Sequence, residues 1–217
     1  MQLKNKSNVH YDLVVCSKST KKYITYFRYS DCLIIKKPPT IDILKQKNTK
    51  ENVLAIGGGA VIDTAKIICK HPITAIPTTY SGASVTNHAV YWDKEKKCNT
   101  NTPLPKTILK PEWVTALPKH VEYASKIDCL CHIMESLASK KGNEKSRRYS
   151  LKALSDIRKD NWLNASIFAG KAINITGTNL IHGLSYYLTG KYKIEHGISL
   201  AHILEMSKDY KKIEELL

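Results

Sequence analysis

The chain has 217 residues, 42% of them apolar, which is enough to bury a sizeable core in one large domain or two small ones. No apolar run approaches the roughly 20 residues of a membrane span, and the first residues lack the apolar stretch of a secretory signal. The six cysteines form no CxxC pair, and we interpret them as reduced thiols. We therefore expect a cytoplasmic protein without a membrane partner.

The charge balance is basic, with 34 Lys and Arg against 19 Asp and Glu and a formal net charge of +15. Such an excess accompanies binding to nucleic acid or to anionic small molecules, and also a solvated lysine-rich surface. The lysines are dispersed, and no basic motif is interleaved with aromatic residues. We interpret the excess as surface charge and expect no nucleic-acid partner, while an anionic substrate stays open.

The first half of the chain has the pattern of an α/β fold. Strands are predicted by short apolar runs at residues 11–15, 32–35, 73–76, 89–92 and 107–109. An amphipathic piece at residues 41–45 has Thr40 as its expected N-cap. Residues 93–97 are charged and predict a turn. Pro118 marks the end of this half.

A glycine-rich turn lies between an apolar strand and a helical pattern in this half. The run 53–56 is followed by Gly57, Gly58 and Gly59, and the helical pattern then carries Asp63. Glycines let a ligand approach the backbone closely, and a helix N-terminus offers free N–H groups to a phosphate. The turn therefore predicts a pyrophosphate site, with a plain strand-to-helix turn as the alternative. It is not the G-x-G-x-x-G fingerprint.

A second polar loop follows the predicted strand at residues 73–76. It contains the hydroxyl side chains of Thr78, Thr79 and Ser81. We expect this loop to line the other side of a cofactor diphosphate, with a simple polar turn as the alternative.

After Pro118 the pattern becomes helical, with periodic stretches at residues 121–139, 147–157 and 162–176. We expect an α/β dinucleotide-binding domain over residues 1–118 and a helical metal-binding domain over residues 119–217.

One aspartate and three histidines in the second half suggest a metal site. Asp128 and His132 are four residues apart and share a face on a helix. His182 and His196 are fourteen residues apart, about 21 Å on an unbroken helix. Gly190 lies between them and predicts a helix stop, which would bring the imidazoles back together. These ligand types suit Zn²⁺ or Fe²⁺ with an open position, and scattered histidines are the alternative.

Four motifs in order resemble those of the iron-containing alcohol dehydrogenase family. GGGAVIDTAK (57–66) is similar to the family's GGGSxxDxAK loop, and AIPTTYSGAS (75–84) is similar to its IPTTxGTGSE loop. IDCLCHIMES (127–136) resembles its DALxHAxE helix, and NLIHG…EHG (179–197) resembles its two later histidine ligands. The resemblance runs over roughly residues 37–205. Within the family, the run 169–197 looks most like the phosphonoacetaldehyde reductases of phosphonate biosynthesis.

The resemblance implies an α/β cofactor-binding half and an all-helical half, the fold shared with dehydroquinate synthase, with the site in the cleft between them. It implies that Asp128, His132, His182 and His196 bind Fe²⁺ or Zn²⁺. For the cofactor, NAD(H) or NADP(H), it implies that Gly57, Gly58, Gly59 and Asp63 hold the diphosphate. It also implies that the ribose and nicotinamide side faces Thr78, Thr79, Ser81 and Lys97.

The activity implied is reduction of a small aldehyde to the alcohol, with phosphonoacetaldehyde as the best single substrate and a homo-oligomer as the working form. Many relatives carry another histidine where this chain has Tyr186, so we expect Tyr186 to relay a proton or to pack. The candidates for binding a phosphonate are Arg147, Arg148 and Lys191.

The chain departs from the family pattern in length, with 56 residues before Gly57 and 21 after His196. We expect these short ends to weaken the adenosine pocket and the closure of the cleft. Two alternatives therefore stay open: a non-catalytic binding or structural protein on this fold, and a lyase like dehydroquinate synthase.

Overall fold

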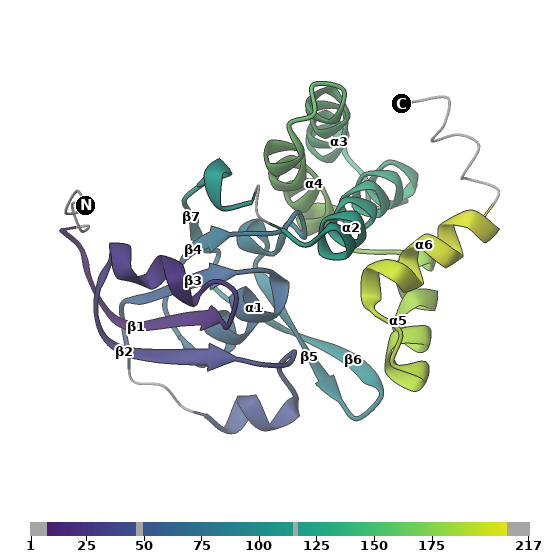
Figure 1. Cartoon of the computed structure of the whole chain (residues 1–217). Coiled ribbons are helices and arrows are strands. Elements are labelled where there is room, and N and C mark those ends of the chain that lie inside the picture. Colours follow the sequence, from purple (N-terminus) through teal and green to yellow (C-terminus); the bar gives the residue numbers. More distant parts are fainter. Residues whose placement is uncertain (1–7, 47–49, 115–116, 208–217) are drawn as a thin grey trace.

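The computed structural model describes residues 8–46, 50–114 and 117–207, which form an α/β half and a helical half (Figure 1). The predicted architecture of an α/β part followed by an all-helical part is confirmed. Within the described residues, no helix is both long enough and apolar enough to cross a membrane.

A parallel sheet forms the core of the α/β half, with the strand order β2-β1-β3-β4-β7. Leu13 and Val15 pack on one side of the sheet with helix α1, whereas Val14 and Cys16 pack on the other side with Trp113. Burial on both faces explains the continuous apolar runs of the central strands. The elements are β1 (His10–Ser17), β2 (Arg28–Ile35), β3 (Val53–Gly57), α1 (Gly59–Ile68), β4 (Thr74–Pro77) and β7 (Lys106–Thr107).

Short 3-10 helices complete this half: η1 (Lys21–Tyr26), η2 (Ile41–Lys45), η3 (Ala83–Val85) and η4 (Pro111–Trp113). Thr40 is at the N-cap position of η2, but its side chain makes no capping hydrogen bond. The strand predicted at residues 107–109 is only the two-residue β7, which ends at Thr107.

A separate antiparallel hairpin extends from the sheet toward the helical half (Figure 1). Its strands are β5 (His88–Asp93) and β6 (Lys96–Asn101). The predicted charged turn at residues 93–97 was too long, because only Lys94 and Glu95 lie between the strands and Lys94 has a positive φ of 52°. Lys97 is therefore a strand residue, paired with Trp92.

The helical half is organised around α2, which contacts each of the other four helices. Leu130 and Ile133 of α2 pack against α3 and α4, and Cys131 packs against α6. Because α2 contacts all four of the other helices, polar residues on α2 can lie close to residues of several helices at once. The helices are α2 (Lys119–Ala138), α3 (Glu144–Ile157), α4 (Trp162–Thr176), α5 (Leu180–Tyr192) and α6 (His196–Met206).

Two glycine contacts join the halves. In α4, a Cβ on Gly170 would lie 2.7 Å from the carbonyl oxygen of Gly82, in the loop after β4. In α5, a Cβ on Gly190 would overlap the carbonyl oxygen of Glu95 at the hairpin tip. Both positions need glycine because backbone from the other half approaches too closely for any side chain.

The prediction that Gly190 stops a helix was wrong. Helix α5 continues to Tyr192, and Lys193 at its C-cap takes the left-handed conformation with a φ of 59°. Gly190 instead provides room for the Glu95 carbonyl. The new helix expected near His196 is confirmed, because α6 begins at that residue.

Candidate metal centre and cofactor loop

The polar face of α2 carries the first two predicted metal ligands. Asp128 and His132 are one turn apart, and the Nε2 atom of His132 lies 3.4 Å from Oδ1 of Asp128. Glu135 lies on the same face, one turn beyond His132, and its carboxyl group is buried. The helix therefore presents two carboxylates and an imidazole along one line.

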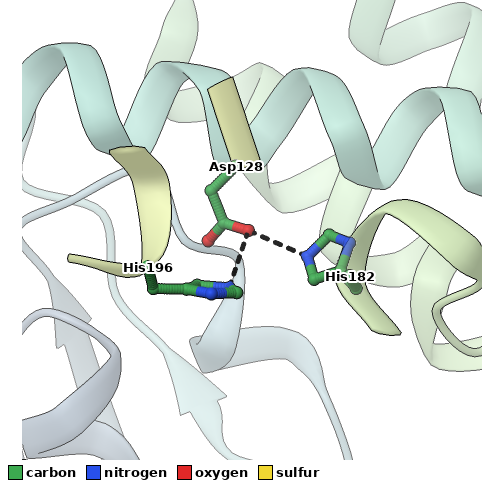
Figure 2. Close-up of side chains that lie close together, drawn as sticks. All are labelled: Asp128, His182 and His196. Carbon is green, nitrogen blue, oxygen red and sulfur yellow. Dashed lines mark hydrogen bonds and ion pairs between the residues drawn. The ribbon is translucent and has the colours of Figure 1, made fainter. Parts of the chain in front are cut away.

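Helices α5 and α6 bring the other two histidines to the same carboxylate (Figure 2). The distance to Oδ1 of Asp128 is 3.2 Å from Nε2 of His182 and 3.9 Å from Nε2 of His196. One ligand atom each from Asp128, His182 and His196 lies within 4.8 Å of the others. Residues distant in sequence thus converge on one point, although no helix stop at Gly190 is needed to achieve it.

His132 lies at the edge of this group. Its ring stacks on that of His182, with the centroids 4.7 Å apart and an interplanar angle of 7°. The other ring nitrogen, Nδ1, is buried without a hydrogen-bond partner in the described part of the chain. The structure therefore brings all four predicted ligands together but orients His132 less firmly than His182.

Glu135 fixes the orientation of His182. Its Oε2 atom is 2.7 Å from Nδ1 of His182, and its Oε1 atom accepts the backbone N–H of His182 at 3.0 Å. This arrangement places a proton on Nδ1 and turns Nε2 toward Asp128. The sequence analysis assigned no role to Glu135, although its spacing of seven residues from Asp128 could have indicated a shared helix face.

The charges at the cluster favour a bound cation. Burial raises the pKa of the Asp128 carboxyl group, but the three surrounding histidines outweigh burial and hold the pKa well below its ordinary value. Burial lowers the pKa of His132 to about 4 and, together with the Lys97 charge, the pKa of His196 to about 3. These two imidazoles are therefore neutral near pH 7 and have lone pairs to donate.

His182 behaves differently. Burial lowers its pKa, but the hydrogen bonds to Asp128 and Glu135 outweigh burial and raise the pKa above its ordinary value. Without a metal, a proton on Nε2 of His182 balances the negative charge of the Asp128 carboxylate. A divalent ion can replace that proton, because one anionic oxygen and neutral imidazole nitrogens are a usual ligand set for Fe²⁺ or Zn²⁺. The residues present therefore fit a divalent metal.

We expect Glu135→Gln to weaken divalent metal binding by roughly 10- to 100-fold, because His182 loses the anion that orients it and raises its basicity. The dissociation constant, measured by competition with a chelator, checks this expectation. The matched control is Glu122→Gln, which removes a carboxylate from the same helix that pairs with Lys126 at 2.7 Å. Equal metal affinity in the two variants would remove the orienting role of Glu135.

The predicted cofactor loop lies at the carboxyl ends of β3 and β4, where ligands of open parallel sheets usually bind. A Cβ on Gly58 would lie 2.9 Å from Cγ2 of Thr79, and a Cβ on Gly59 would lie 3.5 Å from Oγ of Ser81. The backbone N–H of Thr78 donates to the carbonyl of Gly57 at 3.1 Å. The glycine turn and the hydroxyl loop thus pack against each other and form one surface, in which the glycines let the hydroxyl loop approach the backbone closely.

Asp63 and Lys66 connect this surface to the hairpin. Lys66 is buried, lies 3.7 Å from Oδ1 of Asp63, and donates to Oγ1 of Thr86 and to the carbonyl of His88. Burial raises the pKa of Asp63 to about 6, against the attraction of Lys66. Asp63 therefore forms an internal ion pair with Lys66, and Lys66 links helix α1 to the start of the hairpin.

Lys97 and Tyr186 lie together between the hairpin and α5. The Nζ atom of Lys97 is 3.6 Å from the centroid of the Tyr186 ring. That ring is 5.9 Å from the ring of His182 and 5.6 Å from the ring of His196, and its hydroxyl group is 3.3 Å from Oγ1 of Thr178. Tyr186 is thus next to the metal cluster, and Lys97 reaches the same place from the other half.

The comparisons with known proteins agree with this geometry. Residues 122–215 match the model of the Fe-containing alcohol dehydrogenase family, C-terminal part. The chain is 29% identical to the 4-hydroxybutyrate dehydrogenase of Clostridium kluyveri, over 72% of this chain and 54% of that protein. It is 26% identical to the NAD-dependent methanol dehydrogenase of Bacillus methanolicus, over 73% of this chain and 52% of that protein. The chain therefore spans about half the length of these curated relatives.

Solved structures share the fold. The iron-containing alcohol dehydrogenase of Thermotoga maritima superposes with a TM-score of 0.79 at 21% identity, over 99% of this chain and 76% of that one. The maleylacetate reductase of Agrobacterium tumefaciens superposes with a TM-score of 0.75 at 19% identity, over 87% of this chain and 64% of that one.

The fold and the Asp128 cluster define a protein with an α/β half and a helical half, in which the Asp128 cluster is suited to a divalent metal. The matched C-terminal model and the shared fold make the chain similar to the iron-containing alcohol dehydrogenases.

Proposed function

We propose that this chain binds a divalent metal, Fe²⁺ or Zn²⁺, and a nicotinamide cofactor, NAD(H) or NADP(H), and reduces a small aldehyde to the alcohol. The observation that carries this proposal is the convergence of Asp128, His182 and His196 on one point (Figure 2). His132, at the edge of the cluster, is the fourth ligand.

The residues of the chain have distinct roles in this proposal. Asp128, His132, His182 and His196 hold the metal, and Glu135 orients His182. The backbone of residues 57–59 and the hydroxyls of Thr78, Thr79 and Ser81 hold the cofactor. When bound, the metal polarises a carbonyl oxygen as a Lewis acid and the nicotinamide supplies a hydride. The residues then have to place the carbonyl carbon against the cofactor and deliver one proton to the alcohol oxygen.

Tyr186 is the side chain at the cluster that sequence analysis linked to proton transfer. Burial raises the pKa of its hydroxyl group above the ordinary value, so the phenol stays neutral and keeps its proton. Its partner Thr178 is exposed, so the pair Tyr186 and Thr178 connects the cluster to solvent. In this proposal the pair passes a proton inward without Tyr186 becoming anionic.

The relatives support an oxidoreductase acting on a small alcohol or aldehyde, because their names include 4-hydroxybutyrate, methanol and 1-propanol dehydrogenases. Phosphonoacetaldehyde is our finer proposal for the substrate and rests on the resemblance of the run 169–197 alone. The homo-oligomer, the cytoplasmic location and the domain division between residues 118 and 119 are likewise proposals from the sequence.

The test is metal analysis of the purified chain combined with NADH and NADPH oxidation over a panel of aldehydes. We expect about one divalent metal per chain and turnover of at least one short aldehyde. Stoichiometric metal without turnover on any aldehyde would favour the non-catalytic alternative. A product formed without net oxidation of the cofactor would favour lyase chemistry.

A further inference from the structure

The cations that the sequence suggested for binding an anionic substrate do not contact the site. Arg147 and Arg148 are exposed on α3, and Lys191 is exposed on α5, where it donates to the hydroxyl group of Tyr187 at 2.8 Å. In the described part of the chain, none of the three forms a hydrogen bond or an ion pair with a residue of the metal cluster. If the site recognises an anion, a different cation has to do so.

Lys97 lies close enough to the metal cluster to be that cation. It comes from β6 and lies over the ring of Tyr186, whose other ring neighbours include His182 and His196. Lys97 is therefore the basic side chain that the described structure holds between the cofactor half and the metal ligands.

Lys97 is half-buried, and within the described residues its ammonium group has no anionic partner. Within the described residues it makes no ion pair and no hydrogen bond, and its close contact is the face of the Tyr186 ring at 3.6 Å. The carboxylates that act on it from longer range are Asp128, Asp63 and Glu135. The Asp128 carboxylate faces histidines, Glu135 binds His182 and Asp63 pairs with Lys66.

A lysine in this position has three unused donors in a partly dry environment, where a charge-assisted hydrogen bond is strong. Leaving such a cation unpaired is unfavourable, so an incoming anion gains both a contact and the relief of that cost. The aromatic ring below fixes the ammonium group by a cation–π contact without occupying those donors.

We propose that Lys97 binds the anionic group of the substrate, so that the site selects short aldehydes that carry a carboxylate or a phosphonate. This inference rests on the proposed reductase function. It adds the class of substrate and the residue that binds the anionic group of that substrate. The name of one relative refers to an acid of this kind, 4-hydroxybutyrate. The assignment differs from the role implied by the resemblance, in which Lys97 faces the ribose and nicotinamide side of the cofactor, and the two roles predict different kinetics.

The experiment compares kcat/KM for phosphonoacetaldehyde, succinic semialdehyde and neutral propionaldehyde in the wild type and in three variants. For Lys97→Met we expect the ratio of anionic to neutral substrate to fall by roughly 10- to 100-fold, the effect of losing one charge-assisted hydrogen bond. Lys97→Arg should recover most of the ratio. Lys96→Met is the matched control, because Lys96 is an exposed neighbour on the same strand, and it should leave the ratio unchanged.

If Lys97 served only the cofactor, Lys97→Met would lower kcat/KM equally for all three substrates. The ratio of kcat/KM for anionic to neutral substrate would then stay unchanged, and that outcome overturns the proposal. The two anionic aldehydes separate a phosphonate preference from a carboxylate preference. Calorimetric titration with unreactive methylphosphonate and propionate provides a readout independent of turnover. Binding that is lost in Lys97→Met but kept in Lys96→Met supports the anion site even if no variant transfers hydride, whereas equal binding in both variants contradicts it.

Discussion

Replacing His182 and His196 together with alanine is expected to take the protein from about one bound divalent metal per chain to almost none. The two histidines supply two of the four ligands and lie 3.2 and 3.9 Å from Oδ1 of Asp128. The remaining pair, Asp128 and His132, lies on a single helix and supplies only two of the four proposed protein ligands. The measurement is metal content by atomic spectroscopy after dialysis against a weak chelator.

The single variant His196→Ala and the control His202→Ala keep this test informative if the double variant does not fold. His182 is buried and bound to Glu135, so its removal leaves a cavity and an unpaired carboxylate that destabilise the fold. The side chain of His196 is 31% exposed, so His196→Ala removes a ligand with less disturbance. The matched control is His202→Ala, on the exposed side of the same helix α6, which should retain full metal. Stoichiometric metal in a folded double variant would show that the site lies elsewhere.

Replacing Gly58 with valine is expected to weaken cofactor binding strongly while leaving the fold in place. A Cβ at this position would lie 2.9 Å from Cγ2 and 3.1 Å from Oγ1 of Thr79, so the added side chain would fill the space between the two loops. The backbone of Gly58 is extended, with a φ of −81°, so the substitution imposes no conformational strain. The Thr79 side chain can rotate away, but a diphosphate cannot share the space.

The measurement is fluorescence titration with NADH and NADPH, and thermal unfolding monitors the fold. We expect an increase of at least about tenfold in the dissociation constant, which corresponds to about 1.4 kcal/mol. Gly183→Ala is the matched control, because a Cβ there meets nothing within 4 Å. Wild-type affinity in a folded Gly58→Val variant would exclude the glycine loop as the diphosphate site.

The sequence predicted the metal ligands better than the path of the chain between them. Asp128 and His132 could be placed together because helical spacing is a local rule. The stop at Gly190 was predicted from another local rule, that glycine often follows a helix end. That rule failed because this glycine meets the carbonyl of Glu95, about a hundred residues away in sequence, and no local pattern records such a contact.

The hairpin shows a second limit of the sequence analysis. Strand β6 has the sequence KKCNTN and lacks the alternation of apolar and polar residues that marks a half-buried strand. It forms because β5 provides a partner along its whole length, from His88 opposite Asn101 to Asp93 opposite Lys96. The resemblance assigned Lys97 to the cofactor side, and its contact with Tyr186 follows from the hairpin, which the pattern of β6 does not predict. Glu135 was overlooked because only the folded helix pair shows its contact with His182.

The two glycine contacts between the halves have a mechanical consequence. Gly170 meets the loop at Gly82, and Gly190 meets the hairpin tip at Glu95, so at these two separated points the backbones of the two halves meet with no side chain between them. Two fixed points define an axis. If both contacts persist while substrate enters and product leaves, the halves can only rock about the line that joins them, and sliding or twisting movements are blocked.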